Sequence, residues 1–216
     1  IEQLHSTKYL THQDTMKANT LLIFGALCLL LSLASFTKPP VGYKIGDKVA
    51  DFSLKGVDGK NHSLAEFKQA KGYIIVFTCN ECPYAQMYEQ RIIQLHNKYS
   101  KLGYPVLAIN PSLVDYFPEE SYDEMVKHSK ASKFTFHYLF DKNQGVTKLF
   151  RPSKTPHVFL LDKNRVVKYI GAIDDNPQSA VAVKKKYVES AIEALNKGKN
   201  PTPAETKAIG CAIKIN

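Results

Sequence analysis

The chain has 216 residues, of which 44% are hydrophobic and 23% are charged, as is typical of one globular domain with an added segment. A chain of this length can bury an adequate core, and four cysteines do not make a disulfide-stapled mini-fold. The formal net charge is +9, but its lysines are scattered apart from residues 184–186. We therefore interpret the excess charge as a solvated surface and predict no nucleic-acid partner.

The amino-terminal segment predicts export. Residues 16–34 begin with Met16 and Lys17, continue into an apolar run over residues 21–36, and place small residues where a cut after Ala34 would need them. This is the pattern of a signal peptide. The alternative is an uncleaved membrane anchor formed by residues 21–36. Both interpretations place the protein in the periplasm or another extracytoplasmic compartment.

The remaining segments divide the chain into a domain and its flanks. Residues 1–15 are polar and aperiodic, so we expect a disordered or artefactual extension, and residues 35–46 have the composition of a linker. The folded domain is expected over residues 47–197. A carboxyl-terminal tail over residues 198–216 is rich in Pro and Lys but ends with apolar residues.

The first elements of the domain are short. Residues Asp51–Leu54 predict a strand, and Asp58-Gly59 is a turn signal that follows it. Residues Ser63–Glu66 have a capping-box pattern, which predicts a short helical turn.

The centre of the chain combines a strand and a helix around two cysteines. Residues Tyr73–Thr78 form a continuous β-branched and aromatic run, typical of a strand buried on both faces. Pro83 suits the first turn of the helix, where its missing N–H is tolerated. The residues expected on the inner helix face recur at spacings of three and four: Tyr84, Tyr88, Ile92, Leu95 and Tyr99.

The second half alternates again between strands and helices. We expect a buried strand over Tyr104–Asn110, a helix over Pro118–Ser132 with Met125 and Val126 inward, a strand over Tyr138–Phe140 and a helix over Val146–Phe150. Pro156 then opens a strand that ends at Asp162, and Arg165–Ile170 returns as its hairpin partner. A closing helix over Gln178–Lys197 would turn Val181, Val188, Ile192 and Leu195 inward. This order predicts an α/β domain with a mixed sheet.

Cys79 and Cys82 lie between the central strand and its helix, three positions apart. The amide groups and positive dipole end of a helix start favour thiolate over thiol, so we expect Cys79 to be an exposed nucleophile of low pKa. Cys82 is one turn away and could resolve a mixed disulfide formed on Cys79. The pair therefore predicts a dithiol–disulfide couple.

Two other interpretations of this pair stay open. The cysteines could be buried core residues, or they could bind a metal together with His157. A second cysteine pair or a histidine pair at zinc spacing is absent from the sequence, which favours the redox interpretation.

These motifs resemble the thioredoxin superfamily from about Val41 to the end of the chain. The strand–Cys79-x-x-Cys82–helix unit is similar to that family's active site, and Thr155-Pro156 is similar to its cis-proline loop. The resemblance implies a thioredoxin-like fold, with a central mixed β-sheet flanked by helices. It also implies a redox-active disulfide between Cys79 and Cys82, and substrate binding at Thr155 and Pro156.

The branch resembled is the redoxin branch, which includes alkyl hydroperoxide reductases and thiol-specific antioxidant proteins. The entry Val49–Leu54 and the Asp58-Gly59-Lys60 turn are similar to it. Three further segments resemble a peroxiredoxin-like thioredoxin subgroup: Phe77–Tyr84, Ile173–Asn176 and Ile209–Lys214.

The chain departs from the peroxidatic members of that branch. Their Pro-x-x-x-Thr-x-x-Cys pattern would place Thr at Val76 and Pro at Gly72, so both residues that shape the peroxide pocket are missing. This ranks thiol peroxidase, with its antioxidant activity, below disulfide exchange. The carboxylate of Glu81 between the thiols opposes thiolate formation, which predicts a reducing couple.

The sequence thus predicts an exported thiol–disulfide oxidoreductase in which Cys79 attacks and Cys82 resolves. Its expected partners are disulfide-containing client proteins and an upstream redox protein, because no nucleotide or other cofactor fingerprint is present. Cys211 has three possible roles: a third redox thiol, a contact to another chain, or packing in the tail, which its Ile-rich surroundings favour. Arg91 is interpreted as a solvated charge on the helix.

Overall fold

A computed structural model describes residues 42–111 and 114–215 of the chain. The predicted extension, signal peptide or anchor, and most of the linker lie outside these residues. Within the described ranges, none of the helices combines the length and apolar character needed to cross a membrane.

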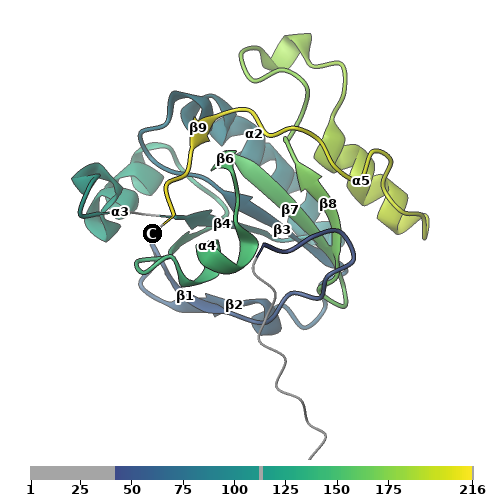
Figure 1. Cartoon of the computed structure of the whole chain (residues 1–216), viewed down its shortest axis with the longest axis horizontal. Helices are drawn as coiled ribbons and strands as arrows, with labels where there is room; N and C mark the ends of the chain where they lie inside the picture. Colours follow the sequence, from purple (N-terminus) through teal and green to yellow (C-terminus); the bar gives the residue numbers. More distant parts are fainter. Residues whose placement is uncertain (1–41, 112–113, 216) are drawn as a thin grey trace, which may run out of the picture. The chain divides into compact units, whose positions relative to one another are not determined.

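The domain is built on a mixed seven-stranded sheet with the order β2-β1-β5-β4-β3-β7-β8 (Figure 1). The three central strands, β3, β4 and β5, are parallel, whereas the outer strands are antiparallel to their neighbours. The strands have these bounds: β1 Ser53–Gly56, β2 Asn61–Ser63, β3 Gly72–Phe77, β4 Val106–Asn110, β5 His137–Phe140, β7 His157–Asp162 and β8 Val167–Gly171.

Helices cover both faces of the sheet. In the described ranges the α-helices are α2 Pro83–Tyr99, α3 Tyr122–Ala131, α4 Gly145–Phe150 and α5 Tyr187–Asn196. Single 3₁₀ turns are η1 Leu64–Glu66, η2 Ser100–Leu102, η3 Pro118–Glu120 and η4 Ala180–Ala182. This arrangement confirms the predicted thioredoxin-like class of a mixed sheet flanked by helices.

Two hydrophobic clusters follow from the period-two geometry of β3, whose six residues are all buried. Ile74 and Val76 point to the side that packs against α2 and α5. Tyr73, Ile75 and Phe77 point to the opposite side, where they pack with residues of η1 and α4. The predicted buried strand and the inner face of α2 are confirmed: Tyr88, Ile92, Leu95 and Tyr99 are all buried, and Tyr84 is half-buried.

The predicted closing helix over residues 178–197 is wrong in its first half. Only Tyr187–Asn196 is α-helical, and the side chain of Val181 is 98% exposed. Polar side chains bind the backbone here instead: Asn176 accepts from the N–H groups of Gln178 and Ser179, and Asp175 accepts from the N–H of Lys184. These side-chain acceptors offer the backbone an alternative to helical hydrogen bonds.

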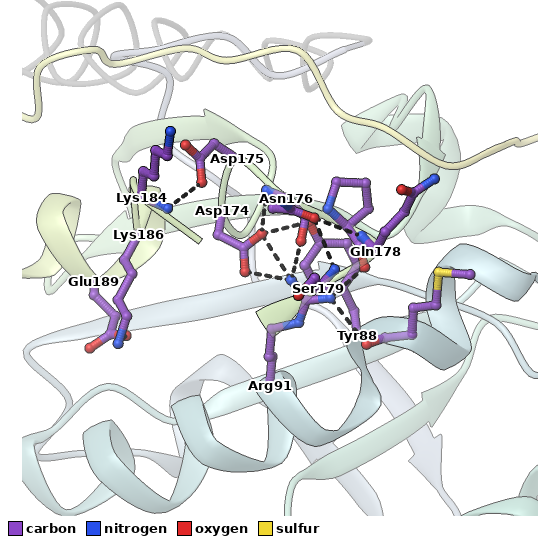
Figure 2. A network of polar contacts seen from close by, with 12 residues as sticks. Tyr88, Arg91, Asp174, Asp175, Asn176, Gln178, Ser179, Lys184, Lys186 and Glu189 are labelled. Carbon is purple, nitrogen blue, oxygen red and sulfur yellow. Dashed lines mark hydrogen bonds and ion pairs between the residues drawn. The ribbon is translucent and has the colours of Figure 1, made fainter. Parts of the chain in front are cut away.

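The same segment changes the interpretation of Arg91. Figure 2 shows Arg91 rising from α2 toward the loop that follows β8, where it meets Asp174. Its guanidinium also donates to the carbonyl oxygens of Asn176 and Pro177. Arg91 is therefore a buried anchor of the Cys-bearing helix, and its prediction as a solvated charge was wrong because the loop closes over it.

The tail packs against the domain along two stretches. Its first stretch lies beside β8, where Ile170 N–H donates to Ala204 and Thr206 N–H donates back to Ile170. Its second stretch forms β9 (Cys211–Ala212), which pairs antiparallel with β6 (Lys154–Thr155). Figure 1 shows β9, in yellow, next to β6.

Candidate active site

The candidate active site begins where β3 ends and α2 begins. Thr78 still donates its N–H to Ile109, as part of the sheet, and the chain then turns away through Cys79, Asn80 and Glu81. Cys82 is the N-cap of α2 and Pro83 occupies its first turn, as predicted. Cys79 is half-buried, whereas Cys82 is almost completely buried.

A buried carboxylate holds the loop that carries Cys79. Glu120, from η3, accepts hydrogen bonds from the N–H groups of Asn80 at 2.9 Å and Glu81 at 3.0 Å. It also accepts from the side-chain amide of Asn110 at 2.7 Å. Tyr138 extends the network, because its hydroxyl donates to Asn80 Oδ1 and accepts from the same Asn110 amide. The loop is therefore held in place by side chains from η3, β4 and β5, in addition to its covalent connection to α2.

The disulfide in the structure joins Cys82 to Cys211, with a Cα–Cα separation of 6.1 Å, and Cys79 is a free thiol. The pairing implied by the family resemblance, Cys79 with Cys82, is thus not the one formed here. The favoured role of Cys211 as an apolar packing residue is corrected as well. The physical reason is the β6–β9 ladder, which places Cys211 opposite Thr155 and within bonding distance of Cys82.

The expected low pKa of Cys79 is also wrong for this state. Burial, followed by the negative charge of Glu120, raises the pKa of the Cys79 thiol to about 11. Hydrogen bonds from Thr155 and from the Cys82 backbone act in the opposite direction but are outweighed, and Glu81 adds a smaller upward effect. Hydrogen bonding therefore stabilises the Cys79 thiolate less than burial and the neighbouring carboxylates destabilise it.

Thr155 lies against the two cysteines, at the start of the predicted cis-proline loop. The Thr155–Pro156 peptide bond is cis. The hydroxyl of Thr155 is 3.2 Å from the sulfur of Cys79, and its carbonyl oxygen is 3.3 Å from the sulfur of Cys82. This one residue thus contacts both cysteines, through its side chain and its backbone.

A cavity of about 260 Å³ opens beside the free thiol. Its wall includes Cys79, Glu120, residues 211–214 of the tail and Phe117, which is 47% exposed. A partner that reaches Cys79 through this cavity would therefore meet the tail.

The metal site proposed from Cys79, Cys82 and His157 is not supported. The sulfur of Cys82 is in the disulfide, and His157 Nδ1 accepts the N–H of Ser153 at 3.1 Å. Burial lowers the pKa of His157 to about 4, so its ring is neutral at pH 7.

Three other side chains with metal-ligating atoms cluster at a place away from the cysteines. Ligand atoms of His62, Glu66 and His137 lie within 4.8 Å of one another in the described part of the chain. His62 is already held at both ring nitrogens, by Glu66 at 2.9 Å and by Asp58 at 3.0 Å. His137 begins β5, at the end opposite to the Cys79 loop, so this cluster is no part of the candidate active site.

The sequence analysis missed Glu120, Asn110 and Tyr138. Asn110 gives a weak signal, because a polar residue that ends a buried parallel strand lies at the same sheet edge as the loop after the neighbouring strand. Glu120 gives none, since it stands 40 positions from Asn80 in a polar segment.

Comparison with known proteins places the chain in a family. A solved structure of a hypothetical protein from Sinorhizobium meliloti 1021 is 32% identical, with a TM-score of 0.75, over 81% of this chain and 96% of the other. An uncharacterized conserved protein from Geobacillus kaustophilus is 30% identical, with a TM-score of 0.73, over 81% and 93%.

Similar curated sequences are named thiol-disulfide oxidoreductases. The thiol-disulfide oxidoreductase ResA of Geobacillus thermodenitrificans (strain NG80-2) is 26% identical over 163 residues, which cover 72% of this chain and 89% of that protein. The model of the AhpC/TSA family matches residues 45–170, which is more than half of the chain. The Cys-bearing loop, the cis-proline and all of the sheet except Gly171 lie within that match. The chain therefore belongs to the AhpC/TSA family.

Proposed function

We propose that the protein is a thiol–disulfide oxidoreductase that reduces disulfides of client proteins through Cys79 and Cys82. The observation that carries the proposal is the position of the free Cys79 thiol, next to the bonded Cys82, beside a cavity and 3.2 Å from Thr155. The similarity to proteins named thiol-disulfide oxidoreductase ResA supports the same activity.

The reaction begins with all three cysteines reduced. The Cys79 thiolate attacks one sulfur of a client disulfide, that bond breaks, and the other client sulfur leaves as a thiolate. Cys82 then attacks the Cys79 sulfur of the mixed disulfide, which releases the second client thiolate and leaves a Cys79–Cys82 disulfide. The client gains two electrons and the enzyme loses two.

The environment of the pair suits this division of roles. Cys79 is the more accessible of the two, so the client meets it first. The reduced Cys82 thiol can donate to the carbonyl oxygen of Thr155, 3.3 Å away, which keeps it beside the cis-proline loop until the mixed disulfide forms. An upstream redox protein must return the electrons. We place this reaction outside the cytoplasm, on the strength of the signal-like residues 16–34.

The test is the reduction of insulin disulfides with dithiothreitol as the electron source. The wild-type protein should accelerate the reaction, whereas Cys79→Ser and Cys82→Ser should both fall to the uncatalysed rate. Cys82→Ser alone should also accumulate a mixed disulfide with insulin, because it can attack but cannot resolve. An unchanged insulin rate in Cys79→Ser would overturn the proposal.

Peroxide provides the contrasting substrate. Val76 occupies the position of the peroxidatic Thr, and a valine has no hydroxyl to offer a peroxide. Its side chain is also completely buried in β3. We therefore expect hydrogen peroxide to oxidise Cys79 no faster than an ordinary thiol at the same pH. Oxidation many orders of magnitude faster, in a stopped-flow measurement, would make the protein a peroxidase instead.

A further inference from the structure

The tail occupies the edge of the cis-proline loop. In the β6–β9 ladder Cys211 stands opposite Thr155 and Ala212 opposite Lys154. The edge of Thr155 is where an extended client segment would pair under the proposed function, since added strands use exposed sheet edges. β9 therefore lies in the place of a client, with its own cysteine bonded to Cys82.

The tail is shaped to approach this loop closely. A Cβ atom at Gly210 would overlap the carbonyl oxygen of Thr155 and lie 2.7 Å from its carbonyl carbon. Real Cβ atoms do not come so near to backbone atoms, so any larger residue would push the tail outward. Glycine at this position lets Cys211 reach Cys82.

β9 itself has few contacts apart from the disulfide, because its ladder is two residues long and Ala212 is exposed. The next residues add a small set: Ile213 packs against the core, Lys214 O accepts from the side chain of Gln144 at 2.8 Å, and the Lys214 ammonium lies over the ring of Tyr116. The preceding stretch is held better, because Thr206 bonds both Ala172 and Tyr169 through its hydroxyl. Segments with few buried contacts open at low free-energy cost. Without the disulfide, release of β9 needs only the contacts of Ile213 and Lys214 to break, while the tail stays attached at Thr206.

We propose that Cys211 is a third redox cysteine, and that it alternates with Cys79 as the disulfide partner of Cys82. This inference rests on the proposed function and extends it. One oxidised form has the Cys82–Cys211 bond, with β9 on the loop and Cys79 free. The other has the Cys79–Cys82 bond, with Cys211 free and β9 released.

The exchange between these forms is balanced within the chain. After the client is reduced, the Cys211 thiolate attacks Cys82 in the Cys79–Cys82 disulfide; a Cys82–Cys211 bond forms, the Cys79–Cys82 bond breaks, and Cys79 leaves as a thiolate that takes a proton. No electrons enter or leave. The upstream reductant then meets the Cys82–Cys211 disulfide, and its reduction frees both the resolving thiol and the loop edge.

Tryptic peptides separate the two oxidised forms. Cys79 and Cys82 lie together in the peptide 72–91, and Cys211 lies in the peptide 208–214. The oxidised full chain should be alkylated under non-reducing conditions, digested and analysed by mass spectrometry. We expect the linked peptides 72–91 and 208–214 in most chains, with the alkyl group on Cys79.

Two variants complete the experiment. Cys211→Ser should give only the internal disulfide of peptide 72–91, and Cys79→Ser only the linked pair. Wild-type protein oxidised by insulin and quenched with acid at successive times should show the internal disulfide first and the linked pair later. An internal disulfide that persists, with alkylated Cys211, would overturn the inference.

The same samples separate this inference from the proposed function. If insulin reduction depends on Cys79 and Cys82 while Cys211 stays alkylated, only the redox role of Cys211 is contradicted. If the protein does not reduce insulin at all and the linked peptides are present, the proposed function is contradicted, and the Cys82–Cys211 bond is a structural disulfide.

Discussion

Arg91 Nη1 lies 2.7 Å from Asp174 Oδ2, and both side chains are nearly inaccessible to solvent (Figure 2). This pair joins α2, whose N-cap is Cys82, to the segment that follows β8. Asp174 also accepts from the hydroxyl of Tyr88 at 2.8 Å and from the N–H of Asn176 at 3.0 Å. The carboxylate thus accepts from three residues, and the pair fixes the helix against the segment after β8.

Arg91→Ala should therefore destabilise the protein strongly. Removing one member of a buried ion pair leaves the other charge uncompensated, which costs about 3–5 kcal/mol. We expect a loss of this size in the free energy of unfolding measured with urea. Lys98→Ala is the control, because its ion pair with Glu189 is 56% exposed on the lysine side and such pairs contribute at most about 1 kcal/mol. Equal losses in both variants would show that Arg91 does not anchor α2.

The free thiol of the oxidised protein should react slowly at neutral pH. With a pKa of about 11 against an ordinary value of 9.0, Cys79 has about a hundredfold less thiolate at pH 7 than an unperturbed cysteine. Its alkylation rate by iodoacetamide should rise about tenfold per pH unit up to pH 10. The same protein unfolded in urea is the control, and its rate should level off near pH 9. A folded-state rate that levels off below pH 8 would contradict the raised pKa.

Glu120→Gln should lower the pKa of Cys79 and weaken the loop at the same time. The substitution removes the negative charge that raises the pKa, second only to burial. It also replaces a carboxylate that accepts from Asn80 and Glu81, and hydrogen bonds to charged groups contribute about 1.5–3 kcal/mol each. The alkylation profile should shift to lower pH, and the free energy of unfolding should fall.

The exposed neighbour Glu119 gives a matched control for this change. Only its backbone carbonyl takes part in the network, where it accepts from the side chain of Asn80. Glu119→Gln should therefore leave both the alkylation profile and the stability unchanged. A shift of the same size in both variants would assign the effect to general surface charge.

Gly210→Ala should move the oxidised protein toward the Cys79–Cys82 disulfide. The added methyl group would collide with the carbonyl of Thr155, so β9 must withdraw from β6. We expect fewer linked peptides 72–91 and 208–214, and more of the internal disulfide, by non-reducing mass spectrometry. Ala212→Ser, on an exposed residue of the same strand, should keep the wild-type distribution. An unchanged distribution in Gly210→Ala would mean that the close approach does not hold the tail.

The sequence by itself determined the elements that local patterns encode. A six-residue β-branched and aromatic run, two cysteines and Pro83 were enough to place β3, the loop and α2, because buried strands and helix starts have strong local signals. The order of strands and helices, together with Thr155-Pro156, was enough for the mixed sheet and the family. The prediction failed in the first half of the last helix, where Asp175 and Asn176 bind the backbone through their side chains. It also failed at Ser121, where extended backbone separates a 3₁₀ turn from α3 within the helix predicted over residues 118–132.

The tertiary structure alone decided the state of the cysteines. The pairing of Cys82 with Cys211 spans 129 positions and depends on the β6–β9 ladder, whose two short strands have no sequence signal of their own. The pKa of Cys79 depends on burial and on Glu120, which folding brings next to the loop from a distant segment. Likewise, Arg91 became an anchor only when residues 174–177 closed over α2. Local composition sets secondary structure and motif, whereas charge proximity, burial and disulfide choice arise from contacts between residues far apart in the chain.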